Sequence, residues 1–401
     1  MKLLSALLVV AFAVVACGSQ RPLAGRSAVA GSVDPAMTAS LDTPVSAGSS
    51  SRVPVVPAIA AACVAHPASS ATLAQLVGQK LFVAMHGTTP TAALLARIRR
   101  GEVGGVILFG SNITTKTALI ALTGKLRAAA AAGNQPPLLI ATDQEGGSVK
   151  RISWAPPTLS PPQMGRIGST TTARDQGAST GSALRSLGIN VDFAPVADVP
   201  ASTASFMYQQ GRTWSFSSTT TAALADAFAT GLESRGVIPS MKHFPGLGYA
   251  TRNTDDYVVS INASAAALAP GLRPYRTAIA HHVPLIMLSN ASYTAYSAYP
   301  ASWSYTIGVT ILRHELGFTG ATITDSLDGA ARARGVTVRR LAVYAARAGA
   351  DMILTTGSET STTGVFDWLL HDVMIGTIST ATLRSSYTRI MALKARAAGC
   401  S

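Results

Sequence analysis

The chain has 401 residues, of which 48% are apolar and 13% are charged, and it carries a formal net charge of +13 at pH 7. This composition is typical of a globular protein with a large core and excludes a wholly disordered chain. The sequence contains no run of basic residues with interleaved aromatic residues, so we expect no nucleic-acid partner. An anionic membrane surface or wall polymer near the protein explains the positive charge more simply.

The first residues have the pattern of an export signal. Lys2 precedes an apolar run over residues 3–15, and the small residue Ala16 stands directly before Cys17. These features are typical of a secretory signal, and the run is too short to span a membrane. Cys17 resembles the lipobox cysteine of bacterial lipoproteins, which implies removal of residues 1–16 and lipidation of the thiol. We therefore expect an exported protein, lipid-anchored at the outer face of the cytoplasmic membrane, with a plain signal peptide and a chance cysteine as the alternative.

Residues 17–68 are rich in Ala, Ser, Pro and Gly and poor in charged and aromatic side chains. Such a segment buries too little apolar surface to offset the entropy of ordering it, so we expect a flexible tether. With Cys17 lipidated, Cys63 and Cys400 remain, one at each end of the folded part. An even pair in an exported chain favours a disulfide, and domain termini often lie close together; two free thiols are the alternative.

Apolar, β-rich runs recur along residues 69–401, and Ala-rich segments with helical spacing separate most of them. We expect strands at Lys80–Met85, Val106–Phe109, Leu138–Thr142, Val191–Val196, Val237–Met241, Pro284–Leu288, Ala321–Thr324 and Asp351–Thr355. We expect helices at Thr171–Leu187, Thr220–Arg235, Leu272–Ala280 and Arg334–Ala348. Continuous apolar runs suit strands covered on both faces, and eight strands alternating with helices predict an α/β fold, the (β/α)8 barrel. A doubly wound open sheet is the main alternative, but no Gly-x-Gly-x-x-Gly motif opens a helix after the first strand.

A barrel of this kind places its chemistry at the carboxyl ends of the strands. Polar clusters follow four of the expected strands: Asp143–Arg151 after the third, Asp198 and Arg212 after the fourth, Lys242 and His243 after the fifth, and Asp325–Gly329 after the seventh. Any one of these clusters could be ordinary helix capping. Because all four would meet at one rim, together they predict an active site.

Four segments carry a resemblance to a known family: Asp143–Gly147, Lys242–Gly246, Leu312–Phe318 and Ile323–Leu327. Through them the chain from about Leu73 to Leu393 resembles glycoside hydrolase family 3, specifically its single-domain β-N-acetylhexosaminidase branch. With the lipobox, it is similar to the lipoprotein members of that branch in actinobacteria. The resemblance implies an exo-acting, retaining enzyme that removes terminal N-acetylglucosamine from peptidoglycan fragments or related wall glycans. We expect a carbohydrate partner, no cofactor or metal ion, and a monomer.

The resemblance also assigns roles to individual residues. Asp325 matches the catalytic nucleophile of the family. The residues that match its N-acetylglucosamine site are Asp143, Arg151, Arg212, Lys242 and His243. Arg212 matches only through an Arg-x-aromatic pattern. The Lys-His-Phe-Pro-Gly form, unlike the forms in the family's glucosidases, implies a preference for the 2-acetamido sugar.

The loop after the Lys-His-Phe-Pro-Gly segment departs from the family pattern. Many members carry Asp-Ser-His there, and an Asp-His pair serves as acid and base, whereas this chain has Asn253-Thr254-Asp255, followed by Asp256. Leu247 also replaces a common His. Either a carboxylate has taken over the proton transfer, or the acid comes from elsewhere, or activity is reduced. Carboxylic acids do this task in most glycosidases when burial raises their pKa, so we favour Asp255, with Asp256 next.

Two other functions stay open. One is a catalytically weak, lipid-anchored sugar-binding protein that kept the sugar site and lost the acid. The other is a family 3 β-glycosidase with another sugar specificity. Turnover of a chromogenic N-acetylglucosaminide separates these functions from the favoured one, because an activated leaving group needs little protonation.

Overall fold

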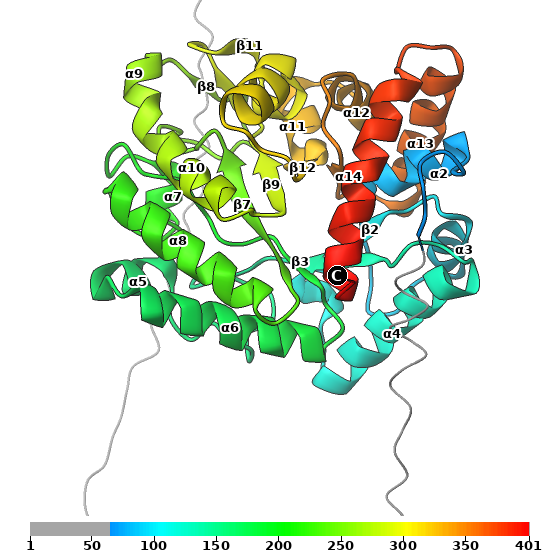
Figure 1. Cartoon of the computed structure of the whole chain (residues 1–401), viewed down its shortest axis with the longest axis horizontal. Helices are drawn as coiled ribbons and strands as arrows, with labels where there is room; N and C mark the ends of the chain where they lie inside the picture. Colours follow the sequence, from blue (N-terminus) through cyan, green and yellow to red (C-terminus); the bar gives the residue numbers. More distant parts are fainter. Residues whose placement is uncertain (1–64, 401) are drawn as a thin grey trace, which may run out of the picture. The chain divides into compact units, whose positions relative to one another are not determined.

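The computed structural model describes residues 65–400 (Figure 1). The predictions for the signal peptide, Cys17, Cys63 and most of the tether concern residues outside this range. Within the described range, no helix is both long enough and apolar enough to cross a membrane.

Eight parallel strands form the centre of the fold. In spatial order they are β12 (Ala321–Thr324), β9 (Leu285–Leu288), β7 (Ile238–Phe244), β6 (Val191–Asp192), β3 (Leu139–Thr142), β2 (Gly105–Ile107), β1 (Leu81–Ala84) and β13 (Ile353–Thr355). The ring closes between β13 and β12, where Met352 forms a parallel bridge with Ile323 and its N–H donates to Thr322 O at 2.8 Å. The predicted (β/α)8 barrel is therefore confirmed, and each of the eight strands overlaps one of the expected segments.

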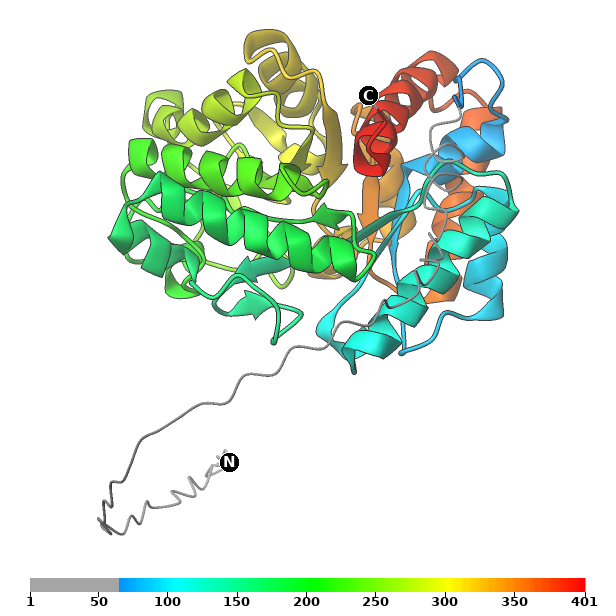
Figure 2. The same ribbon diagram turned by 60° about the horizontal axis from the view of Figure 1, so that its bottom comes forward.

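Helices alternate with these strands and surround the barrel (Figures 1 and 2). The connecting helices are α3 (Ala92–Arg100), α4 (Lys116–Ala132), α6 (Thr170–Ser186), α8 (Ser218–Glu233), α10 (Arg273–Ala280), a π-helix (Thr306–Glu315), α12 (Val338–Arg347) and α13 (Glu359–Met374). The other helices are α2 (Leu73–Lys80), α5 (Pro161–Ile167), α7 (Phe206–Gln209), α9 (Ala265–Leu268), α11 (Leu327–Arg334) and α14 (Thr380–Ala398), with 3-10 turns at Gly110–Asn112, Ala269–Leu272 and Ala301–Trp303. Small strands outside the barrel are β4 (Gln144–Gly146), β5 (Val149–Lys150), β8 (Ser260–Ile261), β10 (Ser292–Tyr293) and β11 (Ser297–Pro300).

The helix expected at Arg334–Ala348 is present as α12, but it begins at Val338, and Arg334 is the last residue of α11. The chain leaves α11 at Gly335, whose φ is 62°, and enters α12 after Thr337, whose hydroxyl accepts a hydrogen bond from Arg340 N. Left-handed backbone favours glycine, and threonine is a good N-cap. The expected start was too early because helical spacing continues back across this boundary; the other three expected helices are also present.

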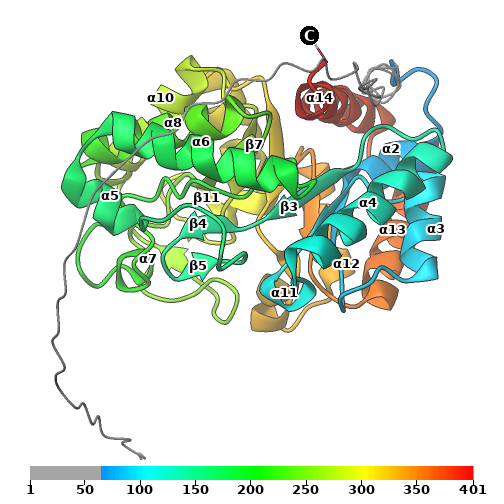
Figure 3. The ribbon, with the colours of Figure 1, turned by 90° about the horizontal axis from the view of Figure 1, so that it is seen from below.

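Helix α14 closes the amino-terminal end of the barrel. Ile390 and Leu393 pack with the side chains inside the barrel. Lys394 is buried, and its Nζ lies 2.8 Å from the carbonyl oxygens of Gly104 and Pro137, near the starts of β2 and β3. In Figure 3, α14 lies on one side of the barrel, and β4, β5, α7 and α11 lie on the other. Any site in the barrel must therefore lie at the carboxyl-terminal end.

Strand β7 runs to Phe244, beyond its expected end at Met241. Its pairing with β9 shifts register between these two residues. Such bulges re-aim side chains, often next to active sites. The consecutive residues Lys242 and His243 both line one cavity at the carboxyl-terminal end of the barrel.

Candidate active site

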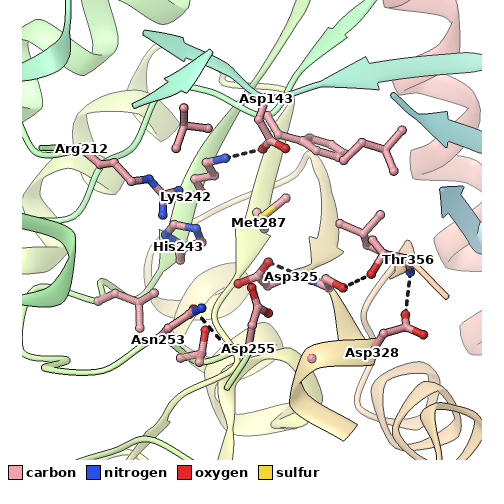
Figure 4. A pocket seen from close by; sticks show the side chains of 18 of the residues that line it. Asp143, Arg212, Lys242, His243, Asn253, Asp255, Met287, Asp325, Asp328 and Thr356 are labelled. Carbon is pink, nitrogen blue, oxygen red and sulfur yellow. Dashed lines mark hydrogen bonds and ion pairs between the residues drawn. The ribbon is translucent and has the colours of Figure 1, made fainter. Parts of the chain in front are cut away.

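A cavity of about 590 Å³ lies at the carboxyl ends of the barrel strands (Figure 4). Its floor is apolar and includes Phe193 and Met287 from the barrel interior. Its polar lining includes Asp143, Glu145, Arg151, Arg212, Lys242, His243, Asn253, Asp255, Asp325 and Asp328. The polar clusters that follow separate strands in the sequence therefore meet at one rim, as the barrel geometry requires.

Lys242 lies between two carboxylates at one end of the cavity. Its Nζ is 2.7 Å from Asp143 Oδ1 and 2.7 Å from Glu145 Oε1. Arg212 binds the same glutamate through two bonds, Nη2 to Oε1 at 2.7 Å and Nε to Oε2 at 2.8 Å. Arg151 is placed more loosely, with Nε 3.8 Å from Asp143 Oδ2. Four of the five predicted sugar-binding residues thus belong to one charged network, together with Glu145.

Glu145 joins the two cations of this network, a role that the sequence alone did not predict. Its side chain is buried. Burial alone would raise the pKa of this carboxyl, but Arg212 and Lys242 beside it lower the pKa to about 2. The residue stands inside a segment that resembles the family, but the need for a buried counter-charge to Arg212 appears only when the two loops are brought together.

Replacing Glu145 by Gln is expected to lower the free energy of unfolding by about 3 kcal/mol at pH 7, because its pKa falls from 4.5 to about 2 on folding. A depressed pKa stabilises the fold fully above pH 4.5, and this stabilisation is lost as the pH falls toward about 2. Urea unfolding should show that the difference in unfolding free energy between the parent and the variant is smaller at about pH 3.5 than at pH 7. The control is Glu102→Gln, which removes a surface pair with Arg100 and should cost less than about 1 kcal/mol. Equal stability of the parent and Glu145→Gln at pH 7 would contradict this account.

His243 is held from behind by Asp198. Its Nδ1 lies 2.8 Å from Asp198 Oδ2, and its backbone N–H donates to Oδ1 at 3.2 Å. The same Oδ1 accepts from Leu247 N at 2.7 Å, so the aspartate also fixes the start of the following loop. Asp198 is fully buried and is absent from the cavity lining. It therefore orients the imidazole, leaving Nε2 for the cavity, a role that its place in a polar cluster of the sequence did not reveal.

Asp325 follows β12 directly and lies near the centre of the cavity (Figure 4). Its backbone N–H donates to Leu288 O at 2.9 Å. Its Oδ1 accepts from the N–H of Ser326 at 2.8 Å. These contacts hold a carboxylate on a buried strand end, which suits a group that must attack at a fixed position.

Asp255 approaches Asp325 from the loop after β7 (Figure 4). It lines the cavity, and its Oδ1 is buried without a hydrogen-bond partner among residues 65–400. Burial and then the nearby charge of Asp325 raise the pKa of Asp255 to about 7. This carboxyl can therefore carry a proton near neutral pH, as a proton donor must.

Asp256, the second candidate for the acid, is exposed and does not line the cavity. Its Oδ2 accepts from Asn253 Nδ2 at 2.8 Å, and its Oδ1 is 3.6 Å from Arg332 Nη2. Asn253 Oδ1 in turn accepts from Asp255 N at 3.2 Å. The loop thus turns one carboxylate toward Asp325 and the other toward solvent.

Comparison with known proteins decides the family. The model of the glycosyl hydrolase family 3 N-terminal domain matches residues 72–393. The chain belongs to glycosyl hydrolase family 3. The family resemblance noted in the sequence is confirmed, and the protein is a glycoside hydrolase.

Other glycoside hydrolases are similar over most of the chain. A secreted glycosyl hydrolase of Arthroderma benhamiae is 35% identical over 345 residues, which cover 84% of this chain and 97% of the relative. A family 3 β-N-acetylglucosaminidase from Paenibacillus sp. superposes with a TM-score of 0.78 at 30% identity, covering 83% of this chain and 64% of that chain. A β-N-acetylhexosaminidase from Beutenbergia cavernae superposes with a TM-score of 0.75 at 29% identity, covering 81% of this chain and 99% of that chain.

The family 3 site contains one further aspartate without a predicted role. Asp328 lines the cavity, but its Oδ2 accepts from Thr356 N at 2.6 Å, which ties α11 to the loop after β13. In residues 65–400, no group of three or more His, Cys, Asp or Glu side chains is arranged to hold a metal ion.

Proposed function

We propose that this protein is an exo-acting, retaining β-N-acetylglucosaminidase. The observation that carries the proposal is the placement of Asp255 beside Asp325 in one cavity, where burial and charge favour the protonated form of Asp255. Retaining hydrolysis needs such a pair, one carboxylate that attacks and one carboxylic acid that gives a proton. The named activity of the relative from Paenibacillus supports N-acetylglucosamine as the sugar, and that of the relative from Beutenbergia supports an N-acetylhexosamine.

In the first step, a carboxylate oxygen of Asp325 forms a bond to the anomeric carbon while the glycosidic bond breaks. Asp255 gives its proton to the departing oxygen, so the rest of the glycan leaves as an alcohol. In the second step, the ionised Asp255 takes a proton from water as the water oxygen attacks the anomeric carbon. The ester bond between Asp325 and the anomeric carbon breaks as the bond to the water oxygen forms, and N-acetylglucosamine leaves with its β configuration.

The charged network around Lys242 supports a role in binding the sugar. Asp143 can accept hydrogen bonds from two hydroxyls, whereas Lys242 and Arg151 can only donate. His243 presents Nε2 to the same cavity because Asp198 holds Nδ1. These groups would hold the terminal sugar with its anomeric carbon toward Asp325.

The substrate that we propose is a terminal N-acetylglucosamine on a peptidoglycan fragment or a related wall glycan. The export signal read from the sequence would place the enzyme among such glycans, and the secreted relative from Arthroderma benhamiae supports export. The net charge of +13 suits an anionic envelope.

Two aryl glycosides test the function. The enzyme should release the phenol from a β-N-acetylglucosaminide with a kcat/KM at least about 10²-fold above that for the β-glucoside, because the polar site is fitted to the acetamido sugar. A preference for the glucoside would favour another family 3 specificity. Binding of N-acetylglucosamine without turnover of either glycoside would favour the sugar-binding alternative.

We also propose that the amino-terminal segments anchor the enzyme to the membrane. Removal of residues 1–16 and lipidation of Cys17 would leave residues 17–68 as a tether between the membrane and the catalytic domain of residues 69–401. Intact-mass analysis of the membrane fraction tests this arrangement. A protein that starts at Cys17 and carries acyl mass supports it, and a soluble, unacylated mature protein contradicts it.

Cys63 and Cys400 are expected to form a disulfide. Closing so long a loop stabilises the fold by on the order of 5 kcal/mol in the chain-entropy model, less any strain. Cys400 lies just beyond α14, where its N–H donates to Ala395 O at 2.9 Å. Peptide mapping without reduction should recover the linked pair. Alkylation of both thiols in the unfolded, unreduced protein would contradict the bridge.

A further inference from the structure

Gly329 lies in the first turn of α11, shortly after Asp325, and it is buried. A Cβ atom at this position would lie 2.6 Å from Oδ1 of Asp255 and 2.7 Å from its Cα and Cβ. Separations this short are not tolerated between carbon atoms, and the Cα cannot move without the loop backbone. Any side chain at position 329 must therefore displace either the helix or the loop that carries Asp255.

The helix is the more firmly held of the two. Ser326 Oγ lies 2.7 Å from Thr356 Oγ1, and Asp328 Oδ2 accepts from Thr356 N at 2.6 Å. Leu327 and Ala330 are fully buried in the core. Moving this turn would break these bonds and would also shift Asp325, which immediately precedes it.

The loop is held less firmly. Arg332 lies on the same face of α11 as Gly329, and its Nη2 donates to Asp255 O at 3.3 Å and lies 3.6 Å from Asp256 Oδ1. Both charged side chains of that ion pair are mostly exposed, so the pair holds the loop more weakly than the buried bonds hold the helix. A Cβ at position 329 would therefore move the loop away from the helix.

We infer that Gly329 is a positioning residue, and that the missing side chain there sets the distance at which Asp255 faces Asp325. The inference rests on the proposed function, with Asp255 as the proton donor. Retaining enzymes hold their two carboxyl groups about 5–5.5 Å apart, and a misplacement of about 1 Å can cost on the order of 10²-fold in rate. Helix α11, which follows the nucleophile Asp325, thus also positions the acid Asp255.

Gly329→Ala tests the inference through its dependence on the leaving group. Its kcat/KM on an N-acetylglucosamine disaccharide should fall about 10²-fold, while the activated aryl glycoside should lose less than about fivefold. The control is Gly124→Ala on α4, where a Cβ meets nothing within 4 Å and both rates should stay unchanged. Parent-like hydrolysis of the disaccharide by Gly329→Ala, or an equal loss on both substrates, overturns the inference.

A double-mutant cycle separates positioning from general damage. In the Asp255→Ala background, Gly329→Ala should cause less than about a threefold further loss on the disaccharide, because the acid that it positions is already gone. A loss of the same factor in both backgrounds shows that Gly329 acts through something other than Asp255.

Arg332→Gln carries the test if Gly329→Ala fails to fold by circular dichroism. The expected result is a threefold to tenfold loss of kcat/KM, the size expected for removing one exposed contact. The loss should be confined to the disaccharide and absent in the Asp255→Ala background. An equal effect on both substrates, or no effect on either, overturns the inference that α11 positions Asp255. Failure of the parent enzyme to cleave the aryl N-acetylglucosaminide would instead overturn the proposed function.

Discussion

Asp325→Asn is expected to lower kcat on every substrate, activated aryl glycosides included, by a factor on the order of 10⁴ or more. The change removes the charge that attacks the anomeric carbon, and a good leaving group cannot compensate for a missing nucleophile. The amide oxygen can still accept from Ser326 N, the bond that Oδ1 makes in the parent at 2.8 Å. Steady-state kinetics with a thermal melt checks both points, and the melting temperature should stay close to that of the parent.

A distant aspartate provides the control for this variant. Asp367 is exposed on α13 and lies outside the cavity lining, so Asp367→Asn should retain full activity. If Asp325→Asn keeps activity within about tenfold of the parent, the nucleophile must be sought elsewhere.

Asp255→Ala is expected to slow natural disaccharides by about 10²–10⁴-fold and aryl glycosides far less, because a good leaving group needs little protonation. The pH profile should change as well. The pKa of about 7 means that the parent loses its proton donor as the pH rises through that value, so its kcat/KM on disaccharides should fall on the basic side. In Asp255→Ala this basic limb should flatten.

Asp256→Ala is the matched control for the loop. Its carboxylate is exposed and outside the cavity lining, so the basic limb and the preference among leaving groups should both persist. If Asp256→Ala reproduces the losses expected of Asp255→Ala, the two roles are reversed. If both variants lose rate equally on both substrate types, the loop acts in binding or closure rather than in proton transfer.

The sequence predicted the barrel because its strands are continuous apolar runs, a pattern that can be recognised without knowledge of tertiary contacts. It placed the start of α12 too early, at Arg334, because the helical spacing runs back through Gly335 and Thr337. It also placed the end of β7 at Met241, because the two polar residues that follow do not look like a buried strand.

The sequence likewise predicted some residues of the candidate site and missed others. Residues that contact the cavity from strand ends, such as Asp325 and Lys242, follow apolar runs and match family motifs, so the sequence identifies them. Glu145 acts by pairing with Arg212 from the connection after β6, and Asp198 by pairing with His243 on β7. Gly329 has no side chain to suggest a role. Such contributions depend on which loops meet, and a single sequence does not contain that information.

We expect Asp325 to form a covalent bond to N-acetylglucosamine during turnover. A 5-fluoro analogue of the N-acetylglucosaminyl fluoride slows breakdown of such an intermediate and allows it to be trapped. Peptide mapping by mass spectrometry after brief incubation should find one added 5-fluoro-N-acetylglucosaminyl group on Asp325, and none in the Asp325→Asn variant. A label on another residue, or turnover of the analogue without any labelled peptide, would contradict the account.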